Sequence, residues 1–443
     1  MFWKPQNLQQ CLRRLYSSSS CLAPTIKQIL NNGQIPAKTV VHGWVKSIRR
    51  QKKATFIAVN DGSTLEGMQA VFLHPNGNVS DTISNVSTGT SVRLIGELIQ
   101  SPGRGQEKEL RVEEVVIFGL CDPLRYPIQK KDHSLEFLRE HMHLRPRTSA
   151  IAAMLRVRGK LTQYFNDWYQ NDGFIYVHPP VLTSNDCEGA GEAYQVMTQA
   201  KGIREEFPLF LTTSTQLHLE ALTSSFTRVF TIAPSFRAER SQTNRHLNEF
   251  WMLEAEINFL EKGLSDVCNV LEASLKTVLG KLIMDEDVRY LREQGHLTEK
   301  QFQYWLNHSI PWTRVSYTQA IERLQEHHLS GRQPYFEFES PKWGQAFRSE
   351  HERWIAATMG ANAQPGPVFV TDYPRNLKPF YMSVNEDIPE GATVACFDLL
   401  VPKLGELVGG SMRESREEKL SESLRLFGMS EPPLYIGNQF VVP

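Results

Sequence analysis

Residues 236–256 combine charged and aromatic side chains at a spacing that suits a nucleotide. The stretch has the pattern of two strands joined by a polar loop. Side chains alternate along a strand, so Arg237 and Glu239 are expected to point the same way. One face of the returning strand should carry Phe250, Met252, Glu254 and Glu256. An arginine fork suits phosphate and carboxylate oxygens, and an aromatic ring can stack on a purine, so this face could bind a nucleotide.

The other face of the returning strand is expected to join the core. It carries Trp251, Leu253, Ala255 and Ile257. Arg245 and His246 fall in the loop, where a triphosphate tail could reach them. The competing interpretation is an amphipathic hairpin whose charged outer face forms salt bridges and binds no ligand.

This string resembles motif 2 of the class II aminoacyl-tRNA synthetases, specifically the subgroup that handles aspartate, asparagine and lysine. The resemblance lies in Arg-x-Glu, a loop with Arg-His, and then Glu-Phe and Glu-x-Glu. It implies that Arg237 is the catalytic arginine, which grips the α-phosphate of ATP and the amino-acid carboxylate. It also implies that Glu239 reads the adenine and that Phe250 stacks on it. Arg245 and His246 would then contact the triphosphate.

Asp398 and Glu406 stand in a segment that could hold a metal ion. Magnesium prefers hard oxygen ligands and commonly takes one or two carboxylates together with phosphates. The resembling family uses the matching pair for Mg²⁺, which also makes Glu406 part of the expected ATP site. Gly409 and Gly410 allow a close backbone approach. In the same family, the arginine that matches Arg413 meets the side-chain oxygen of the substrate.

Two loops that precede the hairpin are candidates for holding the amino acid. Residues 184–192 place glycines beside acids, and residues 213–220 follow a short apolar run. Acidic surface loops are common, so neither loop is specific by itself. In the resembling family both loops hold the amino acid, which implies that Glu188 and Gln216 bind its ammonium group.

The identity of the amino acid can be argued from two neighbouring positions. Aspartate-specific relatives carry a lysine at the position of Leu219, where it pairs with the substrate carboxylate. This chain has leucine there, followed by Glu220. A carboxylate accepts a hydrogen bond from a carboxamide N–H but repels a second carboxylate, and an unpaired charge in a closed pocket rejects the wrong isostere. Because the surrounding residues also look like those of asparaginyl enzymes, asparagine is the expected substrate, and an aspartyl enzyme is the alternative.

Residues 38–120 alternate apolar and polar side chains in short runs that fit an OB-type β-barrel. Strands are expected at residues 40–45, 55–59, 68–72, 91–96 and 113–117. The first connection is basic, with Lys46, Arg49, Arg50, Lys52 and Lys53, and Phe56 follows it at once. A basic loop beside an aromatic ring suits unpaired bases, and a merely solvated loop is the alternative. The resemblance implies that this barrel binds the tRNA anticodon, with Phe56 stacking on the central base and Gln69 hydrogen-bonding it.

The larger part of the chain, residues 146–428, is expected to be an α+β domain: a class II antiparallel catalytic sheet flanked by helices. Residues 121–145 are interpreted as a hinge and residues 262–365 as mostly helical scaffold. A helix over residues 149–170, a strand and Pro180 resemble motif 1, the dimer-forming element of the family. A homodimer with a two-fold axis is therefore expected.

The composition is that of an ordinary globular protein. Of 443 residues, 41% are hydrophobic and 22% are charged, and the formal net charge is −1. This balance excludes a generally basic nucleic-acid coat, so RNA contacts should be local. The six cysteines include no Cys-x-x-Cys pair, so neither a zinc site nor a disulfide frame is expected. No apolar run approaches transmembrane length, and no membrane partner is expected.

Residues 1–24 depart from this average. No Asp or Glu occurs before Asp61, while arginine and serine are frequent near the start. A segment that is rich in arginine and serine and poor in acids is typical of a transit peptide. The mitochondrial matrix is therefore the expected location, and a disordered start without a function is the alternative.

The third motif of class II enzymes is a glycine-rich strand and helix ending in an arginine that clamps the γ-phosphate. We do not find it, and residues 429–443 have an atypical sequence in its place. Removing one such donor typically costs about 10²–10³ in rate, and the missing strand would leave a sheet edge uncovered. The expectation is a chain truncated before motif 3, with a catalytically deficient isoform that binds tRNA or dimerises as a further alternative.

Overall fold

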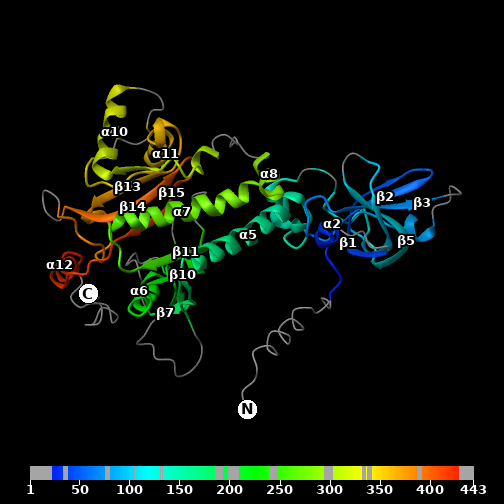
Figure 1. The fold of residues 1–443 in the computed structure, drawn as a ribbon, viewed down its shortest axis with the longest axis horizontal. Coiled ribbons are helices and arrows are strands. Elements are labelled where there is room, and N and C mark those ends of the chain that lie inside the picture. Colours follow the sequence, from blue (N-terminus) through cyan, green and yellow to red (C-terminus); the bar gives the residue numbers. More distant parts are fainter. Residues whose placement is uncertain are drawn as a thin grey trace, which may run out of the picture. The chain divides into compact units, whose positions relative to one another are not determined.

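The computed structural model describes residues 22–32, 38–74, 80–103, 106–129, 131, 133–184, 193–197, 209–238, 247–293, 303–331, 336, 342–386 and 392–428. The chain divides into two compact units. The first comprises Met1–Gly159 with Asp285–Gly295, and the second comprises Lys160–Met284 with His296–Pro443. Figure 1 labels many of the elements of both units.

A closed five-stranded barrel dominates the first unit (Figure 1). Its strands are β1 (Thr39–Arg50), β2 (Ala54–Asn60), β3 (Met68–Leu73), β4 (Ser91–Gln100) and β5 (Lys108–Gly119). Their order is β1-β2-β3-β5-β4, and antiparallel pairing of β1 with β4 closes the ring. The predicted OB-type barrel is confirmed, and each strand extends beyond the residues that its alternation indicated.

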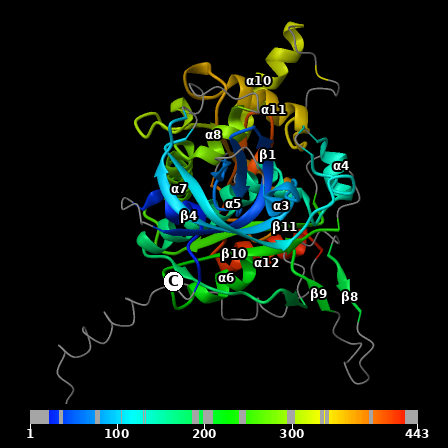
Figure 2. The same cartoon turned by 90° about the vertical axis from the view of Figure 1, so that its right-hand side faces the viewer.

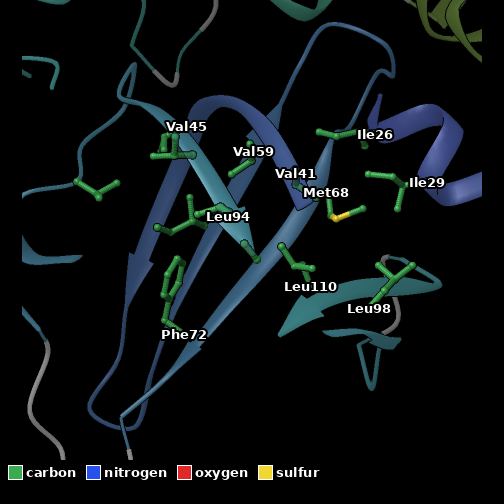
Figure 3. Packing of buried hydrophobic residues seen from close by; sticks show 14 of the residues in the cluster. Ile26, Ile29, Val41, Val45, Val59, Met68, Phe72, Leu94, Leu98 and Leu110 are labelled. Atoms are coloured by element: carbon green, nitrogen blue, oxygen red, sulfur yellow. The ribbon is translucent and has the colours of Figure 1, made fainter. Parts of the chain in front are cut away.

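Inward-facing apolar side chains fill this barrel, as Figure 3 shows. Leu94 and Leu110 come from different strands, meet in the interior and are almost fully buried. A short helix, α2 (Ile26–Asn31), adds Ile26 and Ile29 to the same core. Burial of these side chains away from water is the main stabilising contribution to a domain of this size.

Short helices complete the first unit. They are α3 (Asp81–Ser84), α4 (Leu135–Glu140), the first part of α5 (Ser149–Asn171) and α8 (Glu286–Glu293). Arg156 of α5 donates to both carboxylate oxygens of the buried Asp287 of α8, at 2.9 and 2.6 Å. The same guanidinium donates to the carbonyl of Gly62, at 2.9 Å. One arginine therefore joins α5, α8 and a barrel turn.

Two β-sheets form the centre of the second unit. The first has the order β11-β10-β6 and contains β6 (Ile175–Tyr176), β10 (Arg228–Phe236) and β11 (Glu249–Ile257). The other has the order β12-β13-β14-β15 and contains β12 (Thr313–Ser316), β13 (Val368–Pro374), β14 (Thr393–Val401) and β15 (Gly405–Ser411). Three short strands, β7 (Leu182–Thr183), β8 (Gln195–Val196) and β9 (Leu209–Leu211), form a small separate sheet.

Helices cover both faces of the four-stranded sheet, which confirms the predicted α+β class. The helices of this unit include α6 (Gln216–Thr223), α7 (Leu264–Ile283), α10 (Tyr317–Ser330), α11 (Ser349–Thr358) and α12 (Glu417–Leu426). Figures 1 and 2 both show α10 and α11 side by side. None of the described helices has the length and apolar character needed to cross a bilayer.

Alternation along β14 decides which side chains reach which face. Cys396 and Leu400 pack in the cluster formed with α10 and α11, whereas Phe397 and Leu399 pack in the cluster formed with α7. Asp398 lies between these positions and therefore faces the α10–α11 side. The strand thus carries a carboxylate into an otherwise apolar face.

The predicted core face of β11 is wrong for Trp251 and Ala255. Trp251 is 55% exposed and Ala255 is also exposed, while Leu253 and Ile257 pack against an aromatic cluster. The face that these four side chains share is therefore packed at Leu253 and Ile257 and exposed at Trp251 and Ala255. Alternation identified the two faces correctly but not what packs on them.

Candidate active site and nucleic-acid interface

Arg237 and Phe250 lie together beside the β10–β11 hairpin. Phe250 is paired with Ser235 in the ladder, and Arg237 follows the end of β10. The guanidinium carbon of Arg237 lies 5.5 Å from the centroid of the Phe250 ring, and its Nε donates to the carbonyl of Thr213 at 3.5 Å. A cation beside an aromatic face is favourable, and the two groups can contact the phosphate and the base of one nucleotide.

Several predicted features lie outside the described residues. Among the site residues these are Glu188, Glu239, Arg245 and His246. The atypical segment 429–443 and residues 1–21 of the expected transit peptide are also outside the described ranges. The roles assigned to them stay predictions.

Asp398 on β14 and Glu406 on β15 face a common space. A Cβ placed on Gly409 would lie 3.4 Å from Glu406 Oε1 and 3.5 Å from Asp398 Oδ1, so glycine keeps the space beside both carboxylates open. The charge of Asp398, together with burial, raises the pKa of Glu406 to about 7. Two hard oxygen donors that repel each other beside an open space fit a divalent cation such as Mg²⁺.

The protein supplies few ligands to such a cation. No group of three or more histidine, cysteine or acidic side chains suited to a metal occurs in the described ranges. Magnesium retains water readily and is often held by one or two carboxylates plus substrate phosphates. The donor set therefore fits a metal that completes its coordination with water and nucleotide.

Lys378 is already bound to one of these carboxylates. Its Nζ donates to Oδ1 and Oδ2 of Asp398, both at 2.7 Å, and lies 4.1 Å from the centroid of the Tyr373 ring. The sequence Lys-Pro-Phe-Tyr-Met over residues 378–382 does not by itself indicate this contact. Only the return of the chain after β13 brings the ammonium group to Asp398.

The interpretation of residues 262–365 as chemically quiet scaffold needs a correction at Glu352 on α11. The backbone N–H of Glu406 donates to Glu352 Oε2 at 3.5 Å, and the charge of Glu352 contributes to the raised pKa of Glu406. Glu352 sits in a charged helical stretch that resembles any solvated helix face. No local sequence signal could place it beside the carboxylate pair.

A second cluster, which we call the amino-acid cluster, consists of Gln216, Glu220, Tyr381 and Arg413. Arg413 Nη2 donates to Glu220 Oε2 at 2.5 Å, and its guanidinium carbon lies 3.8 Å from the Tyr381 ring centroid. Tyr381 Oη donates to Gln216 Oε1 at 3.5 Å. Gln216 and Glu220 are one helical turn apart on α6, so both reach the same side of the helix.

The guanidinium group of Arg413 has N–H donors that no described residue uses. Its buried Nε and Nη1 have no partner among the described residues. Although burial opposes the charge, the carboxylates of Glu220 and Glu256 raise the pKa of Arg413. Leu219, which stands where aspartate-specific relatives are expected to carry lysine, is fully buried. The cluster therefore offers a carboxylate acceptor beside free guanidinium donors.

Glu254 has a structural role that alternation alone did not reveal. Its carboxylate accepts from Ser214 Oγ at 2.5 Å, from the backbone N–H of Thr215 at 2.9 Å, and from the Thr215 hydroxyl. It thereby holds the loop that leads into α6. The Glu254 side chain lies on the predicted face of β11, but its carboxylate oxygens accept hydrogen bonds from the protein itself.

Glu256 supports a prediction about pH. Burial raises its pKa to about 8 from an ordinary value of 4.5, with Arg413 opposing this shift and Glu220 and Glu254 adding to it. Between these pH values the folded protein retains a proton that the unfolded chain releases, so stability should fall as pH rises through this window. One pKa unit corresponds to about 1.4 kcal/mol, and Glu256 as a whole is only half-buried, so solvent screening reduces the effect. Glu256→Gln should therefore be more stable than the parent at pH 8 by about 1–2 kcal/mol. Urea unfolding at pH 5 and pH 8 measures this difference, and an equal pH dependence in the two proteins would contradict it.

The two predicted anticodon residues share the outer surface of the barrel. Ile57 and Val59 of β2 point inward, so Phe56 points outward, with the Arg49 guanidinium carbon 4.7 Å from its ring centroid. Gln69 is paired with Ala58 on the neighbouring strand and donates to Glu109 Oε2 at 3.0 Å. A half-buried ring, a cation and a hydrogen-bonding amide thus occur on adjacent strands.

The basic patch near Phe56 is smaller than its sequence indicates. Arg50 Nη2 donates to three backbone carbonyls in residues 83–86. Lys46 Nζ donates to Ser149 Oγ at 2.9 Å. These two cations therefore stabilise the unit itself, and the cations left to the patch are Arg49, Lys52 and Lys53.

A separate cavity of about 440 Å³ lies beside the start of α10. Its lining residues are Ser316, Thr318, Asp372, Asn385, Glu386 and Thr393. Asn385 Nδ2 donates to Asp372 Oδ1 at 3.0 Å, and no predicted site residue lines the cavity. It is not part of the candidate active site.

Comparison with known proteins agrees with the barrel and with the larger α+β part of the chain. The family described as tRNA synthetases class II (D, K and N) matches residues 134–437, and the OB-fold nucleic acid binding domain matches residues 39–118. The asparaginyl-tRNA synthetase of Mus musculus is 41% identical over 94% of this chain and 87% of the relative. The asparagine--tRNA ligase of Thermosynechococcus vestitus is 38% identical over 93% and 89%.

Solved structures lead to the same family. The chain superposes on asparaginyl-tRNA synthetase from Pyrococcus horikoshii complexed with asparaginyl-adenylate, with a TM-score of 0.76 and 26% identity over 92% of this chain and 87% of that one. A putative aspartyl-tRNA synthetase from Leishmania major is 16% identical with a TM-score of 0.72, which is a likeness of fold alone. The chain belongs to the class II aminoacyl-tRNA synthetases, in the asparaginyl-tRNA synthetase family.

Proposed function

We propose that this protein ligates asparagine to its tRNA at the expense of ATP, through an asparaginyl-adenylate. The observation that carries the proposal is the pair formed by Glu220 and Arg413 at 2.5 Å. Glu220 can accept from the N–H of the asparagine side chain, and Arg413 can donate from Nε or Nη1 to its oxygen. An aspartate side chain would place a second carboxylate against Glu220, which is repulsive.

The chemistry requires positioning and charge compensation rather than a protein nucleophile. A carboxylate oxygen of asparagine attacks the α-phosphorus of ATP, the bond to the bridging oxygen breaks, and pyrophosphate leaves. Arg237 would neutralise charge that develops at the α-phosphate, and Phe250 would hold the base. Asp398 and Glu406 would hold Mg²⁺, which, when bound, neutralises phosphate charge. A hydroxyl of the terminal tRNA ribose then attacks the adenylate carbonyl, and AMP leaves.

Parallel ATP–pyrophosphate exchange with asparagine and with aspartate tests the proposal. Exchange with asparagine that exceeds exchange with aspartate supports it. Exchange with aspartate alone would instead establish the aspartyl alternative. Binding of tRNA without exchange of either amino acid would overturn the proposal and favour a catalytically deficient tRNA-binding protein.

The barrel surface around Phe56 is proposed to bind the anticodon. Stacking of one base on an aromatic side chain contributes about 1–3 kcal/mol by alanine substitution, so Phe56→Ala should weaken tRNA binding roughly 5- to 150-fold. Filter binding with the unmodified tRNA transcript measures this loss. Exchange without tRNA should be unchanged, because Phe56 belongs to the other unit of the chain. Tight tRNA binding by the variant would contradict the assignment.

A homodimer through the motif 1 region is also proposed. β6 is the edge strand of its sheet, and its Ile175 is 43% exposed. An exposed apolar side chain on an unpaired strand edge suits an isologous two-fold contact. Sedimentation equilibrium should show a dimer, and Ile175→Asp should shift it toward monomer; a monomeric parent protein would refute the assembly.

The mitochondrial matrix is the proposed location. The support is the acid-free, arginine- and serine-containing composition of residues 1–24, which is typical of transit peptides. Fusion of this segment to a fluorescent protein should direct it into mitochondria. Diffuse fluorescence throughout the cell would oppose the proposal.

A further inference from the structure

Lys378 makes an unusual contact for a residue next to a candidate metal site. Both oxygens of Asp398 accept from its Nζ at 2.7 Å. Both side chains are largely buried, at 16% and 11% exposure. The ammonium group is also held 4.1 Å from the Tyr373 ring centroid, where the aromatic face favours a cation. The lysine is therefore fixed in place rather than swinging in solvent.

The charges explain why a cation is needed there before any ligand arrives. Asp398 and Glu406 border one space, because a Cβ placed on Gly409 would lie 3.4 Å from Glu406 Oε1 and 3.5 Å from Asp398 Oδ1. Glu352 adds a third carboxylate, whose Oε2 accepts from the backbone N–H of Glu406 at 3.5 Å. The Lys378 ammonium group, 2.7 Å from both oxygens of Asp398, offsets this repulsion. Like charges in a partly buried site destabilise each other strongly because water screens them poorly. Without the ammonium group, the pair would attract any available divalent cation.

We propose that Lys378 is a built-in counter-cation that offsets the charge of Asp398 and thereby weakens divalent-metal binding to the free protein. The inference rests on the proposed function, because it assigns the carboxylate pair to a metal. Because the Lys378 ammonium group already neutralises the charge of Asp398, the two carboxylates attract a divalent ion less than they would without the lysine. Nucleotide phosphates supply the additional negative charge that makes metal binding favourable, so metal and nucleotide bind together.

The geometry allows this without displacing the lysine. A carboxylate has about four lone-pair positions on its two oxygens, so Asp398 can keep the hydrogen bond from Lys378 and still present an oxygen to the space beside Gly409. Lys378 is in this sense a positioning residue. It touches a ligand of the metal and neither the metal nor the reacting atoms.

Direct titration with Mn²⁺ in the absence of nucleotide, followed by electron paramagnetic resonance, tests the proposal. Lys378→Met should bind Mn²⁺ at least about tenfold more tightly than the parent protein, because a fixed positive charge close to the site is removed. Lys378→Gln serves as a second neutral variant, and Lys378→Arg should retain the weak parental affinity. A merely structural role would lower metal affinity on substitution, whereas the proposal requires it to rise.

Two further variants locate the effect. Lys281→Met removes the same charge from an exposed position on α7, on the other face of the sheet, and should leave Mn²⁺ binding unchanged. Asp398→Asn combined with Lys378→Met should abolish the gain. Equal Mn²⁺ affinity in the parent and both neutral variants, or a gain that survives Asp398→Asn, would overturn the proposal. These readouts involve neither amino acid nor tRNA, so their outcome is distinct from failure of the proposed ligase activity.

Discussion

Arg237→Ala is expected to reduce ATP–pyrophosphate exchange by about 10²–10³-fold, the usual cost of removing one donor to a developing charge. The guanidinium stands beside Phe250 and is anchored to the carbonyl of Thr213, so it is oriented before any ligand binds. Arg237→Lys should recover only part of the rate, because an ammonium group lacks the planar fork that contacts two oxygens at once.

The control for this prediction is Arg323→Ala. Arg323 lies exposed on α10 in the same unit and pairs with Glu326, at 3.0 Å. An exposed pair of this kind contributes about 0–1 kcal/mol, so exchange should be unchanged. Binding of tRNA by Arg237→Ala, measured in parallel, should also be retained. Exchange within tenfold of the parent rate would remove Arg237 from its catalytic role.

Glu220→Gln is expected to have the second large effect, on both rate and amino-acid choice. Glu220 is the proposed acceptor for the N–H of the substrate side chain, and a hydrogen bond to a charged group contributes about 1.5–3 kcal/mol. The kcat/KM for asparagine should therefore fall roughly 10- to 150-fold. Since the repulsion against a substrate carboxylate also disappears, the preference for asparagine over aspartate should shrink.

Exchange kinetics with both amino acids measure this change. The matched control is Glu422→Gln, which alters the exposed partner of Arg375 at 3.4 Å and should change neither kcat/KM nor preference. A Glu220→Gln protein with an unchanged ratio of asparagine to aspartate would show that the amino-acid cluster does not select the substrate. Selection would then have to come from other groups.

The local periodicity of the sequence was sufficient to predict structural features that depend on a single strand, a single hairpin or a single helix. The strands of the barrel follow from alternation because inward positions such as Leu94 must be apolar. The proximity of Arg237 and Phe250 follows from the two-residue period of paired strands. The spacing of Gln216 and Glu220 likewise follows from one turn of α6.

Features that depend on distant segments could not be predicted in this way. Trp251 was assigned to the core because it shares a strand face with Leu253 and Ile257, yet it is 55% exposed. Arg50 and Lys46 looked like RNA ligands but bond to the protein's own carbonyl and hydroxyl groups. Glu352, on a helix with no chemical motif, reaches the backbone of Glu406.

The amino-acid sequence by itself determined the secondary structure of the barrel and the hairpin, the faces on which Arg237, Phe250 and Glu254 lie, and the family to which they correspond. Only the tertiary structure decided which charges meet: Lys378 with Asp398, Arg413 with Glu220, and Glu254 with the loop before α6. The physical reason is that side-chain direction is set by backbone geometry over a few residues, whereas the electrostatic state of a carboxylate depends on every charge within several ångströms, whatever its distance along the chain.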